Sequence, residues 1–187
     1  MKVVGLTGTM GSGKQTVMDM MLKKVNAYHV TLSDVIRGEL EKKKGSLNRT
    51  TLQDMGNEMR QKYGGHILAL LAVEYLPRDK QMIIVDGIRH PKEVEYLKQK
   101  FGNIFHMIAV DAPMEVRFER VQKRADMKDP RALDEFKAAD SRDKGENEPP
   151  YGQHVGECVK MADFVIKNDG TQRQLETQVN EVLKQIM

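Results

Sequence analysis

The stretch "VVGLTGTMGSGKQTV", which starts at Val3, constrains the fold more than any other part of the sequence. An apolar run leads into Gly8, Gly13 and Lys14 at the spacing of a phosphate-binding P-loop, G-x-x-x-x-G-K-[ST]. Such a loop must follow a strand and open a helix, and the flanking residues predict both. Its glycines let backbone N–H groups wrap phosphate oxygens, and the helix N-terminus adds positive potential. We therefore expect this loop to bind nucleotide phosphates, with Lys14 reaching the outer ones.

Gln15 stands where this motif normally has Ser or Thr, whose hydroxyl binds the magnesium ion of the nucleotide. An amide oxygen is a weaker ligand, but magnesium keeps several waters and relies heavily on the substrate's own phosphates. Gln15 can touch the metal directly or through water, or it can donate to a phosphate oxygen. Thr16 is better aimed at an inner phosphate. We expect an altered metal site that still works.

Short apolar runs alternate with helical patterns along the rest of the chain. The expected strands lie at 2–7, 28–32, 81–88, 103–112 and within 162–170, and the expected helices at 13–26, 33–44, 50–63, 66–76, 91–102, 113–124 and after Thr171. Strands separated by helices predict an α/β fold whose parallel sheet is covered on both faces. A length of 187 residues favours one domain, residues 1–187.

Two inserts flank the carboxyl edge of the predicted sheet, where ligands bind in such folds. The first is helical, covers about 33–76, and has Ser33 or Asp34 as its expected N-cap. The second, about 125–150, is rich in charge and ends in Pro149 and Pro150. We expect it to be a mobile lid or a solvated loop with one helical turn.

Two further motifs carry acid–arginine pairs. In "IIVDGIRHPKE", Asp86 ends an apolar strand beside the P-loop and can hold a magnesium-bound water, while Arg89 projects into the cleft as a phosphate fork. A turn-forming Asp86 and a surface Arg89 are equally compatible with this motif alone. In "TLSDVIRGEL", Asp34 and Arg37 share a helix face. There a carboxylate can orient or deprotonate an acceptor and a guanidinium can grip its phosphate. The alternative is a capping Asp34 and a solvated Arg37.

Arginines are frequent in the segment after the fourth predicted strand. Five of them are Arg117, Arg120, Arg124, Arg131 and Arg142. The first three recur at helical spacing and form one basic stripe, which is either solvated or aimed at a nucleotide. Phosphoryl transfer spreads charge over three oxygens that arginines stabilise. We expect at least one of Arg120, Arg124 and Arg142 to contact nucleotide. Asn168 and the turn at Gly170 are placed to contact its base.

Composition excludes several classes of function. Thirty Lys and Arg against 27 Asp and Glu give a net charge of +3, too mild and too evenly spread to favour nucleic acid. The single cysteine, Cys158, cannot close an internal disulfide, and its neighbours predict a buried small hydrophobe. No apolar run approaches the roughly 20 residues of a membrane span, and Met1 opens directly into a strand. We expect a soluble, cytoplasmic monomer or homodimer.

Five motifs in this order, "GLTGTMGSGK", "LSDVIRGEL", "VDGIR", "RFERVQKR" and "VIKNDGT", resemble the nucleoside monophosphate kinase branch of P-loop proteins over nearly the whole chain. The resemblance is closest to archaeal adenylate-kinase-related proteins, also described as dephospho-CoA kinase-like. It implies a P-loop NTPase three-layer fold with a five-stranded parallel sheet, an acceptor-binding helical insert and a lid. The turn "DGIR" is shorter than the "DGFPR" of adenylate kinases, and the lid lacks the cysteines of zinc-bearing lids.

The resemblance also implies roles for individual residues. The loop from Gly8 to Lys14, which includes Met10, Gly11, Ser12 and Gly13, holds the phosphates of ATP. Arg37 and Arg89 match arginines that bind the acceptor's phosphate, and Arg120, Arg124 and Arg142 match lid arginines. Asp34 resembles the acidic residue that faces the acceptor hydroxyl in dephospho-CoA kinases. The segment "TTLQDMGNEMRQKYG" is similar to one in phage-type deoxynucleoside monophosphate kinases, which makes Arg60 an acceptor-side candidate.

The sequence therefore predicts a kinase that uses ATP and Mg²⁺, with Gln15 and Asp86 at the metal. The expected acceptor is a nucleoside monophosphate. One alternative is a dephospho-CoA kinase that phosphorylates a ribose hydroxyl, with Asp34 as general base. The other is a nucleotide-binding regulatory protein in which Gln15 marks slow or absent turnover.

Overall fold

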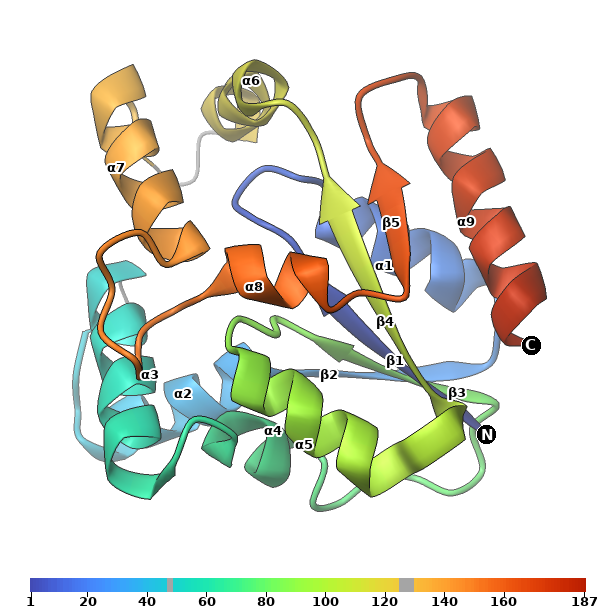
Figure 1. Ribbon diagram of the computed structural model, residues 1–187, viewed down its shortest axis with the longest axis horizontal. Helices are drawn as coiled ribbons and strands as arrows, with labels where there is room; N and C mark the ends of the chain where they lie inside the picture. Colours follow the sequence, from blue (N-terminus) through green and yellow to red (C-terminus); the bar gives the residue numbers. More distant parts are fainter. Residues whose placement is uncertain (47–48, 125–129) are drawn as a thin grey trace.

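The computed structural model describes residues 1–46, 49–124 and 130–187, and at its centre lies a five-stranded sheet (Figure 1). The strands are β1 (Lys2–Thr7), β2 (Ala27–Thr31), β3 (Met82–Asp86), β4 (Phe105–Asp111) and β5 (Phe164–Lys167). Their order across the sheet is β2-β3-β1-β4-β5, and every neighbouring pair is parallel. The expected α/β fold with a five-stranded parallel sheet is confirmed.

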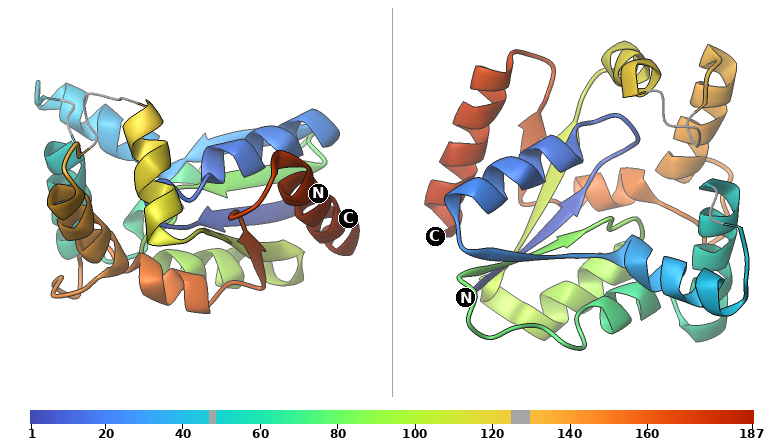
Figure 2. Two further views of the ribbon diagram at one scale, coloured as in Figure 1. Left: turned by 90° about the horizontal axis from the view of Figure 1, so that it is seen from above. Right: turned by 180° about the vertical axis from the view of Figure 1, so that it is seen from behind.

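Helices cover both faces of this sheet because its central strands are apolar on both sides (Figure 2). Val4 and Leu6 of β1 pack on one side with α1 (Lys14–Lys24) and α9 (Gln172–Ile186). Val3 packs on the other side with α4 (Ile67–Ala72), α5 (Pro91–Phe101) and α8 (Val155–Lys160). Cys158 lies in this second core as predicted, and burial raises the pKa of its thiol.

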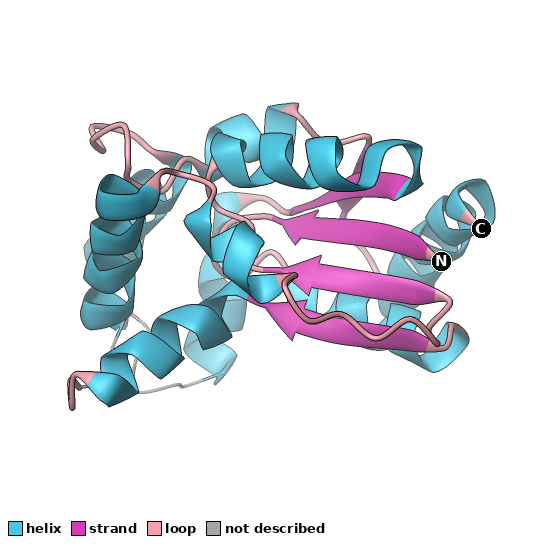
Figure 3. Cartoon of the chain, turned by 90° about the horizontal axis from the view of Figure 1, so that it is seen from below, coloured by secondary structure: helices cyan, strands magenta, loops and turns pink. Residues whose placement is uncertain are grey.

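Four more helices lie near the carboxyl ends of the strands. They are α2 (Leu32–Lys42), α3 (Arg49–Tyr63), α6 (Met114–Arg124) and α7 (Leu133–Lys144). Figure 1 labels α3 and α7 at the left of the molecule, and at the left of Figure 3 helices lie beyond the arrowheads of the sheet. A 3-10 turn, Gly102–Ile104, joins α5 to β4. The strand ends therefore face a space that is walled by helices from distant parts of the sequence.

The prediction for 125–150 as a loop with one helical turn was wrong, because α7 is a helix of 12 residues. Its Phe136 is fully buried and stacks edge-on against Phe118 of α6, with 5.2 Å between ring centroids. A single apolar anchor inside a charged stretch gives too little periodicity to predict this helix. The first part of the predicted lid, residues 125–129, lies outside the described residues.

Smaller differences concern the ends of elements. The hydroxyl of Thr31 accepts from the Ser33 N–H at 3.3 Å, so Thr31 caps α2 instead of the predicted Ser33 or Asp34. Helix α4 ends at Ala72, short of the predicted 66–76, and α8 was not predicted. The cap of α9 at Thr171 is confirmed. In the part of the chain that the structure describes, no helix is both long and apolar enough to cross a membrane.

Candidate functional site

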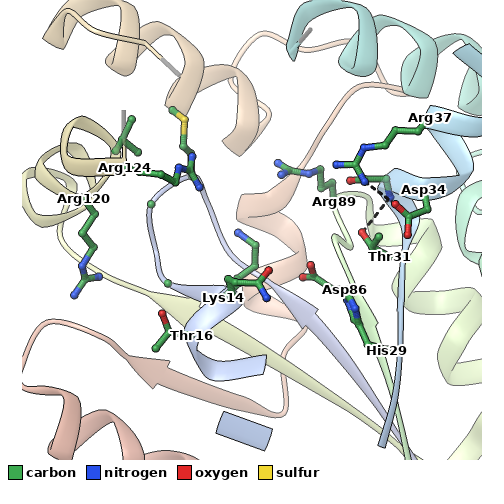
Figure 4. A pocket seen from close by; sticks show the side chains of 16 residues that line it. Lys14, Thr16, His29, Thr31, Asp34, Arg37, Asp86, Arg89, Arg120 and Arg124 are labelled. Carbon is green, nitrogen blue, oxygen red and sulfur yellow. Dashed lines mark hydrogen bonds and ion pairs between the residues drawn. The ribbon is translucent and has the colours of Figure 1, made fainter. Parts of the chain in front are cut away.

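A cleft of about 860 Å³ opens at the carboxyl ends of β1, β2 and β3 (Figure 4). It lies beside the point where the strand order reverses, since the connections after β1 and β3 leave toward opposite sides of the sheet. The residues that line it are Met10, Gly11, Gly13, Lys14, Gln15, Thr16, His29, Thr31, Ser33, Asp34, Arg37, Asp86, Arg89, Arg120, Val121 and Arg124. Most of the predicted site residues are therefore brought together in one cavity.

The P-loop forms one wall of the cleft, and its glycines are required by its backbone. Gly8, Gly11 and Gly13 all have positive φ, which side chains other than glycine rarely adopt. A Cβ atom at Gly11 would also lie 2.5 Å from the carbonyl oxygen of Arg117. At Gly13 it would collide with the side chain of Asn168. The loop thus packs its backbone against α6 and the residue that follows β5, and within the loop the Ser12 N–H donates to Thr9 O at 3.3 Å.

Lys14 begins α1, directly after the P-loop. Its ammonium donates to the carbonyl oxygens of Gly8 at 2.5 Å and Thr9 at 3.1 Å. The Lys14 side chain thus folds back onto the P-loop and lines the cleft. Gln15 is exposed and donates to Asp19 at 2.8 Å, one turn further along α1, and Thr16 is exposed beside it. Both line the cleft.

Arg117 supports the P-loop from behind and is not part of a solvated stripe. It is buried, and its guanidinium donates to Ala112 O at 2.9 Å and to Met10 O at 3.3 Å. It also forms a two-pronged ion pair with the buried Asp140 of α7. Burial by itself would raise the pKa of Asp140, but hydrogen bonds from Arg117 and Lys144 outweigh it and lower that pKa.

Asn168 lies behind the P-loop and does not line the cleft where a base was expected. Its amide donates to Ser12 O at 2.9 Å, and its oxygen accepts from Arg120 at 3.2 Å. Gly170 likewise lies outside the cleft lining, and Ser12 is buried. Arg120 and Arg124 of α6 do line the cleft. Asn168 therefore ties the P-loop to an arginine of α6.

The wall facing the P-loop comes from the β2–α2 junction. Asp34 and Arg37, one turn apart, form an ion pair of 2.6 Å, and more than two-fifths of each side chain is exposed. Thr31, used as the helix cap, leaves Asp34 free of that task. Such an exposed pair contributes little to stability, at most about 1 kcal/mol. Both side chains are therefore available to an incoming ligand at small cost.

Asp86 and His29 form the floor of the cleft. Thr31 of β2 pairs with Asp86 of β3, and His29 lies two residues earlier on the same face of β2. Asp86 Oδ1 and His29 Nε2 are buried atoms without a hydrogen-bond partner among the described residues. His29 and Thr31 were missed. The alternation of "YHVTL" would have placed both on one face, beside the predicted Asp86.

Arg89 follows β3 and enters the cleft as predicted, with 24% of its side chain exposed. Its Nη1 donates to Asp143 of α7 at 3.1 Å and to Gln153 at 3.4 Å. The charge of Asp143 raises the pKa of Arg89 against the opposing effect of burial, and Asp86 and Glu93 add to it. Arg89 is thus a permanently charged group at the edge of the cleft.

Two predicted site arginines do not line the cleft. Arg60 is buried in α3 and pairs with the equally buried Glu93 of α5, with 2.9 Å between Nη2 and Oε1. Arg142 of α7 reaches α3 instead, where it donates to Gln53 and Asp54, both at 3.2 Å. Both arginines were expected to contact a ligand, but an arginine on a helix can face a neighbouring helix as readily as a ligand.

Charge decides which ligand the cleft suits. Its lining contains five cations, Lys14, Arg37, Arg89, Arg120 and Arg124, against two carboxylates, Asp34 and Asp86. In a partly enclosed site this excess favours polyanions such as nucleotide phosphates. Within residues 1–46, 49–124 and 130–187, no three His, Cys, Asp or Glu side chains gather to hold a metal ion. A divalent cation there would need ligands from the bound phosphates.

Comparison with known proteins places the chain among P-loop relatives. A family model described as an AAA domain matches residues 4–147, more than half of the chain. A UPF0200 protein of Thermococcus onnurineus strain NA1 is 30% identical over 189 residues, covering 99% of this chain and 98% of that protein. A UPF0200/UPF0201 protein of Archaeoglobus fulgidus is 31% identical over 186 residues. The match covers 98% of this chain but 55% of that longer relative.

Solved structures share the fold. TT1252 from Thermus thermophilus superposes with a TM-score of 0.63 and 20% identity over 100% of this chain and 98% of its own. Shikimate kinase from Bacteroides thetaiotaomicron gives a TM-score of 0.58 and 18% identity over 99% and 98% of the two chains. At these identities the similarity shows the fold alone. That fold is the α/β P-loop fold found in kinases.

Proposed function

This chain belongs to the AAA-domain family and to the UPF0200 proteins, and from that membership and its cleft we propose an ATP-dependent small-molecule kinase. The proposed reaction transfers the γ-phosphoryl group of ATP to a nucleoside monophosphate, ribose or deoxyribose. In this proposal, residues 33–76 bind the acceptor and the segment around α7 acts as the lid. The proposal rests on the residues that line the cleft. It adds to the kinase-like fold a binding site for a phosphorylated acceptor.

One observation carries the proposal: cationic side chains line the cleft on two sides. The P-loop and Lys14 lie on one side, and Arg37 and Arg89 lie on the other. An ATPase or a nucleotide-binding regulator needs only the first set. Arginines on the far wall are what a second phosphorylated substrate requires, because their planar forks bind phosphate oxygens in pairs.

The residues of the chain account for catalysis by positioning and charge neutralisation. Lys14 would leave the carbonyls of Gly8 and Thr9 and bind the outer phosphates of ATP. Arg120 and Arg124, on the α6 wall, would neutralise charge that develops on the transferred group. Arg37 and Arg89 would hold the acceptor's phosphate so that one of its oxygens faces the γ-phosphorus. No strong base is needed, because a phosphate oxygen is already ionised at neutral pH.

The donors present fit a magnesium ion held mainly by nucleotide. Asp86 Oδ1, buried and without a partner among the described residues, is available to accept from metal-bound water. Gln15 is proposed to turn from Asp19 toward the phosphates, where its amide would take the place of the usual hydroxyl. A bound Mg²⁺ would supply charge neutralisation on the β- and γ-phosphates.

The test is ADP release from Mg-ATP, with product identification, against a panel of nucleoside monophosphates, deoxynucleoside monophosphates and dephospho-CoA. Stimulation by a monophosphate, with a diphosphate as product, is the expected result. Silence across the panel despite ATP binding would instead favour a regulatory protein, with Gln15 as the first residue to restore to Ser.

A second candidate, a hydroxyl acceptor such as dephospho-CoA, is favoured by the position of Asp34. This carboxylate lines the cleft and is not used as a helix cap, so it is available as a general base. Asp34→Asn should nearly abolish phosphorylation of a hydroxyl but reduce that of a monophosphate mildly. Equal losses with both acceptor types would remove Asp34 as the group that distinguishes the two reactions.

A further inference from the structure

The guanidinium of Arg89 is held at one corner by two buried acceptors. Its Nη1 makes both of its side-chain hydrogen bonds, to Asp143 Oδ1 at 3.1 Å and to Gln153 Oε1 at 3.4 Å. Nη1 carries two hydrogens, so the two acceptors use all of its donor capacity. Among the described residues, neither Nε nor Nη2 of Arg89 makes a hydrogen bond, although the residue lines the cleft.

The edge that is left, Nε–H together with Nη2–H, is the fork with which arginine binds a phosphate or carboxylate in a two-pronged manner. In Figure 4 the Arg89 side chain lies between the Asp34–Arg37 pair and Lys14. Asp143 and Gln153 thus occupy Nη1, which a two-pronged anion contact through Nε and Nη2 does not use. They leave Nε–H and one Nη2–H for the anion.

Both acceptors are fixed by the protein without any ligand. The Asp143 side chain is fully buried, and Gln53 of α3 donates toward it at 3.5 Å. Gln153 is also buried, and the next residue, His154, donates its backbone N–H to Arg89 O at 2.7 Å. Helix α7 and the segment before α8 therefore set the orientation of a side chain that arises from the end of β3.

Asp86 is an anionic group that lines the same cleft as Arg89, and its charge raises the pKa of Arg89. Its Oδ1 lacks a hydrogen-bond partner among the described residues. A collapse of Arg89 onto Asp86 would neutralise both groups and close the acceptor side of the cleft. Holding Nη1 from α7 and from residue 153 opposes that collapse.

We propose that Asp143 and Gln153 are positioning residues that aim the Nε/Nη2 fork of Arg89 at the phosphate group of the acceptor. The proposal rests on the proposed function, because it takes Arg89 to be an acceptor-side ligand. It adds two residues that no motif indicated. It also makes α7, which lies in the segment expected to form a lid, part of the acceptor site.

The experiment measures phosphate binding at Arg89 directly, without turnover. The ¹⁵Nε–¹Hε resonance of Arg89, assigned by its disappearance in Arg89→Lys, is followed by NMR while inorganic phosphate is added. Gln153→Met removes one acceptor without changing charge or length. Asp143→Glu keeps the charge but displaces the carboxylate by one methylene. The control is Asp134→Glu, the same change at an exposed position of the same helix.

In the wild type we expect the Arg89 resonance to shift with phosphate. In Gln153→Met and in Asp143→Glu the apparent dissociation constant should rise about tenfold, and in Asp134→Glu it should not change. An unmoved resonance in the wild type would overturn the proposal, as would a wild-type dissociation constant in Gln153→Met. If Asp143→Glu does not fold, Gln153→Met still decides.

The NMR measurement distinguishes failure of the positioning role of Asp143 and Gln153 from failure of the proposed kinase activity. Phosphate binding at an aimed Arg89, together with no turnover on any acceptor of the panel, would leave the inference standing and remove the proposed kinase. Turnover on a monophosphate with an Arg89 resonance indifferent to phosphate would do the reverse.

Discussion

Gly11 and Gly38 form a matched pair for testing the P-loop at the scale of one residue. Gly11 has φ +77°, and a Cβ there would lie 2.5 Å from the backbone oxygen of Arg117, whereas Gly38 in α2 has nothing within 4 Å. Gly11→Ala should destabilise the protein by about 2 kcal/mol or more and abolish ATP binding. Gly38→Ala should stabilise it by about 0.5–1 kcal/mol. Urea unfolding and ATP titration measure both, and equal stabilities of the two variants would contradict this reading.

Lys14 is expected to act on the phosphates rather than on stability. Its ammonium donates to two carbonyls of the loop, those of Gly8 and Thr9. Lys14→Met should lower kcat/KM of the acceptor-dependent reaction by about a hundredfold to a thousandfold, with little change in unfolding free energy. Lys23→Met, at an exposed position of the same helix, is the control. Comparable losses in both variants would show that helix charge, not contact with phosphate, is responsible.

At the scale of single residues, the sequence indicated which residue types form the site better than it indicated where each side chain points. A strand end or a tight turn fixes the position of the side chain that follows it. For this reason the sequence could place the P-loop glycines, Lys14, Asp86 and Arg89. Arg117 and Arg120 share one helical stripe, yet the first is buried against Asp140 and the second lines the cleft. Their difference depends on α7, whose position no local pattern reveals.

At the scale of elements, helix α7 was not predicted from the sequence and is known from the structure. Phe136→Ala should destabilise the protein by about 3–5 kcal/mol, because it removes a fully buried ring that packs against α6. Leu133→Ala, which truncates a half-exposed side chain of the same helix, should change stability by about 0.5 kcal/mol or less. Urea unfolding compares them. A small effect of Phe136→Ala would mean that α7 contributes little to the folded domain.

The other elements follow from signals of different strength. The strands and α1, α5, α6 and α9 agree with the predictions to within a few residues. Long periodic patterns define them, together with start signals such as Pro91 in the first turn of α5 and the cap Thr171 of α9. Helix α8 has six residues and includes Gly156, too short and too weak a helix former to be recognised. Its place in the core comes from tertiary packing of Val155 and Cys158.

At the scale of the whole molecule, His90 links the end of the sheet to the segment that carries Gln153. Its Nδ1 accepts the Lys92 N–H at 3.1 Å as the cap of α5, so Nε2 carries the proton and donates to Pro150 O at 2.9 Å. Burial lowers the pKa of His90, although the Pro150 hydrogen bond and Glu93 oppose this. Arg60 and His154 act in the same direction as burial.

A lowered pKa in the folded state means that the unfolded chain binds the proton more readily. The unfolding free energy should therefore be constant above the unfolded pKa of about 6.5 and fall as pH decreases below it. His90→Asn keeps a capping oxygen without titration, so this slope should decrease. A residual slope is expected from His106, whose pKa burial also lowers. Denaturant titrations between pH 5 and 8 measure the slopes, and identical ones in wild type and His90→Asn would contradict the assignment.

The parallel sheet and the location of the cleft at its carboxyl edge follow from the sequence, because the strands alternate with helices and a P-loop comes after the first strand. The contacts between α3, α7 and the turn after β3 could not be predicted from the sequence. They join residues far apart in sequence, such as Gln53, Arg89 and Asp143, and depend on how separately predictable elements dock.

The central claim is that one cleft binds phosphates from two sides and passes a phosphoryl group between them. The most direct measurement follows the label of γ-labelled ATP in the presence of each monophosphate of the panel, in wild type and in Arg89→Gln. The account predicts label in an organic diphosphate, with a large loss in Arg89→Gln. Label found only in inorganic phosphate, or transfer that is indifferent to Arg89, would contradict it.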